Sequence, residues 1–130
     1  MKSKYLSIDI GASSGRAIVI IVDKEKIQID EVYRFLNETL FIDDKLYWNF
    51  NHLMTEVKKG IELSYLKHPE FKSIGIDTWG VDYGLIDSDG NLIGQPRCYR
   101  DDRNHLAKAL FHQAYDSKAL YRSTGIQQLP

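Results

Sequence analysis

The stretch that decides the fold runs from Tyr5 to Val22 and reads YLSIDIGASSGRAIVIIV. Apolar and polar residues alternate from Tyr5 to Ile10, which is the period of a half-buried strand. Five small residues with a glycine at each end follow, and the sequence then continues as an apolar, mostly β-branched run from Ala17 to Val22. We therefore predict two antiparallel strands joined by a five-residue loop at Gly11–Gly15.

A third strand is predicted from Ile27 to Phe35, after a short charged turn at Asp23–Lys26. Its alternation slips at the adjacent polar pair Asp30-Glu31, so we expect a β-bulge near that point. Strands that follow one another with such short connections are expected to pair antiparallel.

The hydrophobic period then changes to three and four residues. Apolar residues recur at this spacing from Phe50 to Leu66, and an asparagine, Asn49 or Asn51, is available as the N-cap. We predict an amphipathic helix here that ends at His68-Pro69. Gly60 inside it costs about 1 kcal/mol relative to alanine, and we expect it to permit close packing of the helix on the sheet.

The rest of the chain is predicted to contain further strands and two helices. In chain order these are a buried strand at Ile74–Thr78, a strand at Tyr83–Ile86 that turns through Asp87–Asn91 into Leu92-Ile93, and helices near Asn104–Tyr115 and Ser117–Thr124, the second stopped by Gly125. Sequential antiparallel strands, followed by a helix crossover to a further strand, favour an α/β fold with a mixed sheet of the ribonuclease-H type and flanking helices.

Composition argues against several classes of protein. The chain has 17 Lys and Arg against 18 Asp and Glu, a formal charge of -1 without any block of like charge, which argues against nucleic acid or an anionic membrane surface as the main partner. The longest apolar run, Ala17–Val22, is far shorter than the roughly 20 residues of a membrane-spanning helix, and no signal-peptide-like stretch precedes the first strand. Cys98 is the only cysteine, which excludes an intrachain disulfide and favours a cytoplasmic protein.

The first group of residues with chemical potential is Asp9 and the loop that follows it. A carboxylate at the strand end stands beside small residues whose backbone N–H groups, with the hydroxyls of Ser13 and Ser14, are able to surround phosphate oxygens. The carboxylate is suited to hold hydrated Mg²⁺. The loop is not a Walker loop, since the Gly-Lys-Ser/Thr ending is absent. On composition alone, an ordinary glycine-rich hairpin turn is the alternative interpretation.

The second group follows the strand predicted at Ile74–Thr78. Asp77, Thr78 and Trp79 place a carboxylate, a hydroxyl and an indole beside Gly80, which allows a ligand to approach the backbone. Polar groups for hydroxyls and an apolar wall for the ring are what a sugar requires. The alternative is a buried tryptophan bracketed by turn glycines.

Three further features are interpreted as structural. The charged run Tyr99–Arg103 reads as a solvated turn with a helix N-cap at Asp102 or Asn104. Trp48 is expected in the core rather than at a ligand. The four histidines have no metal-ligand spacing among themselves or with Cys98, so a zinc site is not expected, and no Ser, His and acid set predicts nucleophilic catalysis.

Taken together in this order and spacing, these segments resemble the start of the FGGY carbohydrate kinases, within the actin, hexokinase and Hsp70 superfamily. Asp9–Arg16 is similar to the family's Asp-x-Gly-x-x-x-x-Arg phosphate loop, and Gly75–Asp77 lies where the family has its second core strand. Asp101 and Arg103 match an Asp-x-Arg pair, with Tyr99 in the place of a tryptophan found in many members. The resemblance covers nearly the whole chain.

The resemblance implies an ATP-dependent kinase that uses Mg²⁺. By analogy, the residues that line the nucleotide phosphates are Ala12, Ser13, Ser14, Gly15 and Arg16. Asp9 would assist the metal, and Thr78, Trp79 and Gly80 would border the sugar.

The implied sugar is a ketose bulkier than glycerol. Glycerol kinases carry an Arg-Glu pair where this chain has Gly80-Val81, and the combination of motifs is similar to the members of the family that phosphorylate L-rhamnulose at its 1-hydroxyl. Two alternatives stay open: a kinase for another deoxy-ketose such as L-fuculose, and a non-enzymatic nucleotide-binding regulator with the same fold. Asp77–Gly80 favours the kinase, because a regulator has no need of a sugar site.

The resemblance also implies that residues 1–130 are the N-terminal part of the first kinase domain. The catalytic base of the family, an aspartate, and the domain that holds adenosine then lie beyond residue 130. The sequence stops at Leu129-Pro130 without a terminating motif, which we interpret as a truncation. We therefore expect the chain to fold around a core of its own but to catalyse no phosphoryl transfer by itself. The sequence leaves its oligomeric state open.

Overall fold

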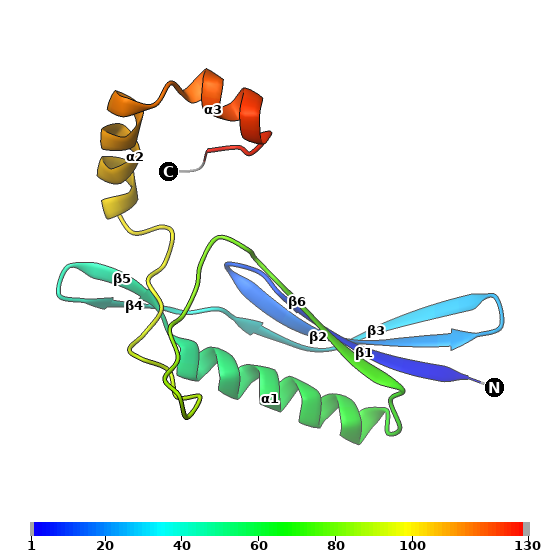
Figure 1. The fold of residues 1–130 in the computed structure, drawn as a ribbon. Coiled ribbons are helices and arrows are strands. Elements are labelled where there is room, and N and C mark those ends of the chain that lie inside the picture. Colours follow the sequence, from blue (N-terminus) through cyan, green and yellow to red (C-terminus); the bar gives the residue numbers. More distant parts are fainter. Residues whose placement is uncertain (1, 129–130) are drawn as a thin grey trace. The chain divides into compact units, whose positions relative to one another are not determined.

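The computed structural model describes residues 2–128 of the chain. It divides into two compact units: the first holds the chain up to Thr39 and from Trp48 to Val81, and the second holds Leu40 to Tyr47 and the chain from Asp82 onward. The elements in chain order are β1 (Ser3–Ile10), β2 (Ser14–Asp23), β3 (Lys26–Leu36), β4 (Thr39–Ile42), β5 (Lys45–Trp48), α1 (Phe50–Lys67), β6 (Ser73–Thr78), α2 (Arg103–Ala114) and α3 (Ser117–Thr124) (Figure 1).

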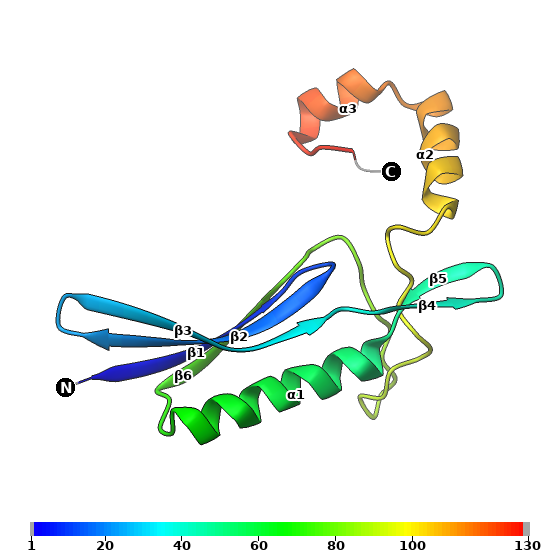
Figure 2. The ribbon, with the colours of Figure 1, turned by 180° about the vertical axis from the view of Figure 1, so that it is seen from behind.

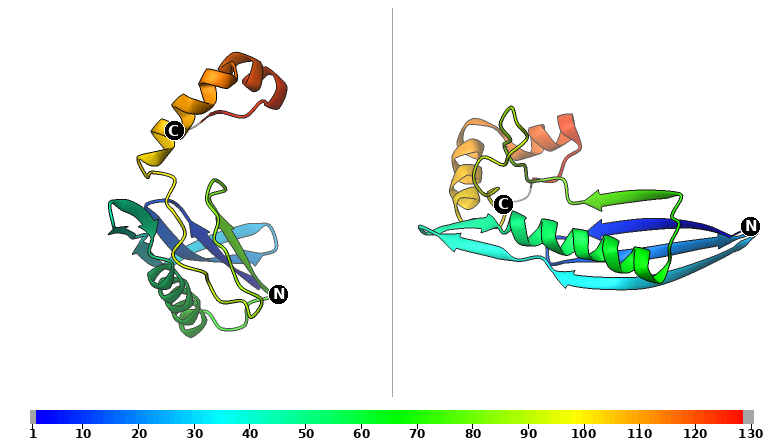
Figure 3. Two further views of the ribbon diagram at one scale, coloured as in Figure 1. Left: turned by 60° about the vertical axis from the view of Figure 1, so that its left-hand side comes forward. Right: turned by 90° about the horizontal axis from the view of Figure 1, so that it is seen from below.

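The first unit is a mixed β-sheet, with both antiparallel and parallel strand pairs, and a helix on one face. Its strands lie in the order β3-β2-β1-β6, with β1 antiparallel to β2, β2 antiparallel to β3, and β1 parallel to β6. Both views in Figure 3 show α1 lying along one face of this sheet. The predicted antiparallel strands, followed by a helix crossover to a parallel strand, are confirmed.

The core lies between α1 and the sheet because the inward positions of both are apolar. Its buried side chains are Leu6, Ile8, Ile10, Ala17, Val19, Phe35, Leu53 and Val57. On β1 only alternate residues are buried, which confirms the period read from the sequence. The face of the sheet opposite α1 therefore carries the polar residues of β1, among them Asp9.

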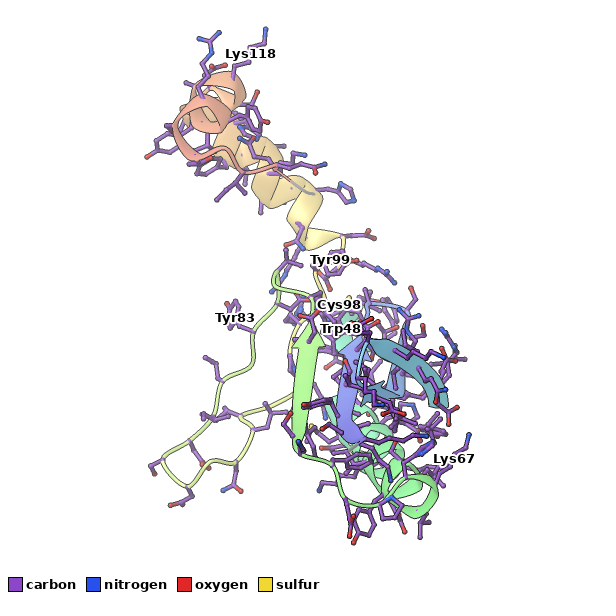
Figure 4. The ribbon with its side chains drawn as sticks, turned by 90° about the vertical axis from the view of Figure 1, so that its right-hand side faces the viewer. Trp48, Lys67, Tyr83, Cys98, Tyr99 and Lys118 are labelled. Carbon is purple, nitrogen blue, oxygen red and sulfur yellow. The ribbon has the colours of Figure 1, made fainter. Side chains whose placement is uncertain are left out.

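The ends and the packing of α1 agree with the prediction. The side chain of Asn49 caps the helix by accepting the N–H of His52 at 3.2 Å, and the helix ends at Lys67 (Figure 4). Gly60 is buried, and a Cβ at this position would meet the Cβ of Ala17 at 3.1 Å. The glycine therefore allows the helix backbone to approach β2 closely.

The first hairpin is tighter than predicted. Strand pairing continues to Ile10 and Gly15, so the loop is Gly11–Ser13 rather than Gly11–Gly15. The N–H of Gly11 donates to the carbonyl of Ser14 at 2.9 Å and closes it. The shorter loop is favoured because each additional backbone pair satisfies groups that would otherwise need another partner.

The predicted bulge in β3 is confirmed. Ala17 pairs with Tyr33, and the next residue of β2, Ile18, pairs with Glu31. Val32 is therefore the extra residue, and it directly follows the polar pair at which the alternation slips.

The hairpin of β4 and β5 was not predicted. Each strand has four residues, too few to display a clear period, and the turn residues Asp43 and Asp44 both have left-handed backbones, with φ of 49° and 56°. Two successive residues with positive φ match the tight turns that connect short hairpins, and aspartate tolerates this conformation better than most residues.

β6 is a strand as predicted, but the prediction that it is buried was wrong. All its residues are exposed, including Ile76 at 61%. The reason is its place at the edge of the sheet: α1 packs on β1, β2 and β3, and within residues 2–128 the only strand that pairs with β6 is β1. An apolar pattern shows what a strand is able to bury, not whether a neighbour covers it.

The second unit contains both predicted helices, α2 and α3, which follow one another in Figure 2. Gly125 ends α3 in a left-handed conformation with φ 68°, as predicted. The predicted strand pair at residues 83–93 is reduced to a single bridge between Ile86 and Leu92. The turn predicted between them is confirmed and is organised around Asp87, whose carboxylate accepts the N–H groups of Asp89 and Asn91. Within residues 2–128, no helix combines the length and apolarity needed to cross a membrane.

The charged run before α2 is not a solvated turn, contrary to the prediction. Asp101 is only 6% exposed, and its carboxylate accepts the N–H of Leu46 at 2.6 Å and pairs with Arg97 at 2.9 Å. It also accepts the N–H of Arg103 at 3.1 Å, whereas Asp102 makes no side-chain cap bond. Asp101 therefore caps α2 and ties it to β5.

Candidate functional site

The two groups of candidate residues meet at the carboxyl ends of two neighbouring strands, β1 and β6. β1 and β6 are parallel neighbours, with Asp9 opposite Asp77 and Ile10 opposite Thr78. The loop after β1 and the Trp79-Gly80 segment after β6 therefore leave the sheet side by side. Ligands of open α/β sheets bind outside the carboxyl ends of parallel strands, so this edge is the natural place for a site.

Asp9 is not a lone acid at its strand end. Arg16 is its partner in the β1–β2 register, and the Nη2 and Nε atoms of Arg16 lie 2.5 Å and 3.1 Å from Asp9 Oδ2. Both side chains are partly exposed, so both remain open to a ligand. The predicted metal residue and a predicted phosphate residue thus form one ion pair.

The loop Gly11–Ser13 is held by Asn37, which sequence reasoning missed. The backbone N–H of Asn37 donates to the carbonyl of Ser13 at 3.0 Å, and its side-chain Nδ2 donates to the carbonyl of Gly11 at 3.1 Å. Asn37 is only 9% exposed. The one available signal was its position, a small amide directly after an apolar strand. By binding two loop carbonyls it orients the loop peptides.

An open cavity of about 360 Å³ surrounds this loop. Its lining residues are Asp9, Gly11, Ala12, Ser13, Ser14, Arg16 and Arg34. Of the predicted phosphate residues, Gly15 is absent from this lining and is buried, with the ring of Phe35 against it. Arg34, on β3, was not predicted to belong to the site.

Arg34 is held by a neighbouring carboxylate. Its Nε and Nη2 atoms donate to Oε1 and Oε2 of Glu31 at 2.8 Å and 2.6 Å. Hydrogen bonding to this carboxylate raises the pKa of Arg34, and the same contact lowers the pKa of Glu31. Both groups are therefore charged at neutral pH.

The candidate sugar segment presents an aromatic wall beside open space. The ring of Trp79 lies 4.7 Å from that of Trp48, centroid to centroid, and Trp48, labelled in Figure 4, is 2% exposed as predicted for a core residue. Thr78 and Gly80 are exposed, and a Cβ at Gly80 would meet no atom within 4 Å. A ligand could therefore lie against the backbone here.

The acidic residues at this edge suit a weakly coordinated metal. Within residues 2–128 there is no group of three or more His, Cys, Asp and Glu side chains that could hold a metal ion. Asp9 and Asp77 are register partners on adjacent strands, so their side chains leave the same face of the sheet. Mg²⁺ is commonly bound through one or two carboxylates while it keeps several waters, and these residues fit that description.

No family model matches the chain, but curated relatives do. The rhamnulokinase of Yersinia pestis (strain Pestoides F) is 39% identical over 127 residues, which cover 96% of this chain. The rhamnulokinase of Bacteroides thetaiotaomicron is 35% identical over 127 residues, which cover 98% of it. The chain is a homologue of the rhamnulokinases. It spans about a quarter of their length, 26% in both cases.

Solved sugar kinases share the fold at much lower identity. Gluconate kinase from Lactobacillus acidophilus superposes with a TM-score of 0.74 at 11% identity, over 97% of this chain and 25% of that protein. Xylulose kinase from Rhodospirillum rubrum gives 0.65 at 15% identity, over 93% and 25%. The predicted fold class, an α/β fold with a mixed sheet and flanking helices, is confirmed by this likeness to solved sugar kinases. The predicted similarity to the kinases that phosphorylate L-rhamnulose is confirmed by the curated relatives.

Proposed function

We propose that this chain is the N-terminal part of an ATP-dependent kinase that phosphorylates L-rhamnulose at its 1-hydroxyl. The observation that carries the proposal is the meeting, at one sheet edge, of the loop after β1 and the Thr78–Gly80 segment after β6. The similarity to rhamnulokinases over nearly the whole chain supports this choice of sugar. The chain spans only 26% of those relatives, and the proposal assigns the catalytic base and the adenosine site to segments outside it.

On the nucleotide side, the loop Gly11–Ser14 and Arg16 bind the phosphates of ATP. Backbone N–H groups and serine hydroxyls donate to phosphate oxygens, and the guanidinium neutralises charge. The ion pair with Asp9 positions that guanidinium beside the loop. Mg²⁺, when bound, neutralises further phosphate charge, and Asp9 with Asp77 would hold it.

On the sugar side, Trp79 forms an apolar wall that is fixed from behind by Trp48. Thr78 supplies a hydroxyl, and the space beside Gly80 accepts part of the ketose. Phosphoryl transfer depends mainly on positioning the reactants and neutralising charge in a cleft that excludes water. The chain supplies one wall of that cleft, so by itself it transfers no phosphoryl group. We place the enzyme in the cytoplasm, where ATP is available.

The test is a chimera in which this chain replaces the segment that it matches in the Yersinia pestis rhamnulokinase. ADP formation is measured with MgATP and, in parallel, L-rhamnulose, L-fuculose and glycerol. We expect the fastest turnover with L-rhamnulose, and no sugar-dependent turnover from the chain alone. A cooperative thermal transition of the chimera serves as the control for folding.

Each outcome decides between the candidate functions. A folded chimera that binds ATP but responds to none of the three sugars contradicts the proposal and favours the nucleotide-binding regulator. Faster turnover with L-fuculose would support the kinase function but show that L-fuculose is the preferred sugar. Turnover by the isolated chain would show that the segments outside it are dispensable, and would overturn the proposed division of the site.

A further inference from the structure

A row of four charged residues crosses the sheet on the face opposite α1. Arg34, Arg16, Asp9 and Asp77 come from β3, β2, β1 and β6, and each is the register partner of the next. Register partners project on the same face of a sheet. The row therefore places two guanidinium groups next to each other on one side and two carboxylates on the other.

The bulge at Val32 explains how Arg34 acquires its partner. In a regular strand, residues three apart point to opposite faces, so Glu31 and Arg34 would be separated by the sheet. The extra residue restores Glu31 to the face of Arg34, where the two form their bidentate pair. Bulges commonly re-aim side chains in this way beside functional sites.

The two arginines line the same cavity. Arg16 and Arg34 both border the open space around Gly11–Ser14. The pair with Glu31 occupies one edge of the Arg34 guanidinium, through Nε and Nη2, and leaves Nη1 able to donate elsewhere. A planar guanidinium group that is fixed along one edge is well suited to present its remaining N–H groups to phosphate oxygens.

We infer that Arg34 is a second phosphate-binding arginine, which acts with Arg16 to take the polyphosphate of the nucleotide at the loop Gly11–Ser14. Glu31 is a positioning residue that holds the Arg34 guanidinium toward the cavity. This inference rests on the proposed function for the identity of the ligand, but the anion site itself can be tested without it.

The charges of the cavity show why Arg34 matters. Of the residues that line the cavity, Arg16 and Arg34 are cations and Asp9 is an anion, so the lining carries a net positive charge; Glu31 pairs with Arg34 but is not part of the lining. Without Arg34, Asp9 would offset Arg16, and the lining would lose the net positive charge that attracts a polyphosphate. Loss of this one cation should therefore weaken binding more than loss of a remote surface charge.

The experiment titrates the chain itself with inorganic tripolyphosphate at low salt, followed by NMR of the loop amides and the arginine Nε–H groups. The variants are Arg34→Gln, Arg34→Lys and, as the charge-matched control, Arg122→Gln in α3. We expect saturable shifts in residues 11–16 for the unmodified chain, with a dissociation constant of about 1 mM. Arg34→Gln should weaken binding by about tenfold and Arg34→Lys by less, since lysine keeps the charge but not the fork.

Two results of the titration would overturn the inference. One is an equal effect of Arg34→Gln and Arg122→Gln, which would mean that only net charge matters. The other is the absence of saturable shifts in the loop of the folded, unmodified chain. The proposed kinase function is judged separately, with the chimera. If the chimera phosphorylates the sugar and Arg34→Gln leaves its Michaelis constant for ATP unchanged, the inference about Arg34 is wrong and the kinase function stands. If tripolyphosphate binding depends on Arg34 but the chimera is inactive, the kinase function is wrong and the anion site stands.

Discussion

The ring of Phe35 occupies the place where a side chain on Gly15 would begin. A Cβ built on Gly15 would lie 2.2 Å from Cζ of Phe35, and the two residues are register partners on β2 and β3. Phe35 is a buried member of the core. The start of β2, directly after the loop Gly11–Ser13, is thus packed against the interior.

Gly15→Ala is therefore expected to destabilise the fold by about 1–3 kcal/mol, because the aromatic ring must shift within a packed core. Urea unfolding followed by circular dichroism measures the change. Gly80→Ala is the matched control, since a Cβ there has open space, and it should unfold like the unmodified chain. Equal midpoints for the two variants would show that the core accommodates the methyl group.

Asn37→Ala should loosen the loop more than it destabilises the domain. The substitution removes the Nδ2 donor to the Gly11 carbonyl, worth about 1 kcal/mol, but leaves the backbone bond to Ser13. Hydrogen exchange at the amides of residues 11–14 is expected to accelerate, while exchange in α1 stays unchanged. Asn51→Ala, on the exposed side of α1, is the control. Unaltered loop exchange in Asn37→Ala would argue that the hairpin alone orders the loop.

Asp9→Asn in the chimera should lower turnover by at least about tenfold without unfolding it. The substitution removes charge from the proposed metal side of the cleft. It should cost little stability, because the Asp9–Arg16 pair is partly exposed and such pairs contribute little. The comparison is made at limiting Mg²⁺. Unchanged turnover in the folded variant would remove Asp9 from the site.

Gly80→Val in the chimera should raise the Michaelis constant for the sugar far more than that for ATP. A branched side chain would fill the space proposed for the ketose, and a Cβ at Gly80 meets no atom within 4 Å in this chain. Steady-state kinetics with each substrate varied in turn give the two constants. If both rise equally, Gly80 serves the backbone turn and not the sugar.

Asp101 is expected to make stability depend on pH in the acid range. The N–H of Leu46 lowers the pKa of Asp101 by hydrogen bonding; burial opposes this, and the Arg97 guanidinium adds to it. A carboxyl with a lowered folded-state pKa contributes stability that is complete above its unfolded pKa, about 3.9, and is lost as the pH falls through the folded value.

Asp101→Asn should therefore unfold more easily at neutral pH and lose less stability between about pH 5 and 2. Thermal unfolding at several pH values measures both effects. Asp116→Asn, at the exposed start of α3, is a useful comparison because asparagine keeps an acceptor for the Ala119 N–H and the substitution removes only the charge. Parallel pH curves for Asp101→Asn and the unmodified chain would mean that Asp101 contributes nothing through its charge.

Local patterns accounted for most of the fold. The alternation in β1, the period of α1 and the stop at Gly125 each depend on residues close together in the sequence, which is why they could be predicted. β4 and β5 could not, because four residues show no period. The exposure of β6 could not either, since it depends on which elements cover a strand and not on the strand itself.

The candidate site divides in the same way. Asp9, the small residues of the loop and the Thr78–Gly80 segment were evident from the sequence, because each is a contiguous motif with its own chemistry. Asn37, Arg34 and the role of Asp101 depended on the tertiary structure. Each of these side chains acts on a residue or a cavity that strand register or chain crossing brings close, and a single sequence carries no record of that pairing. Register across the sheet set Arg34 beside Arg16, and a one-residue bulge decided which face Glu31 shares with it.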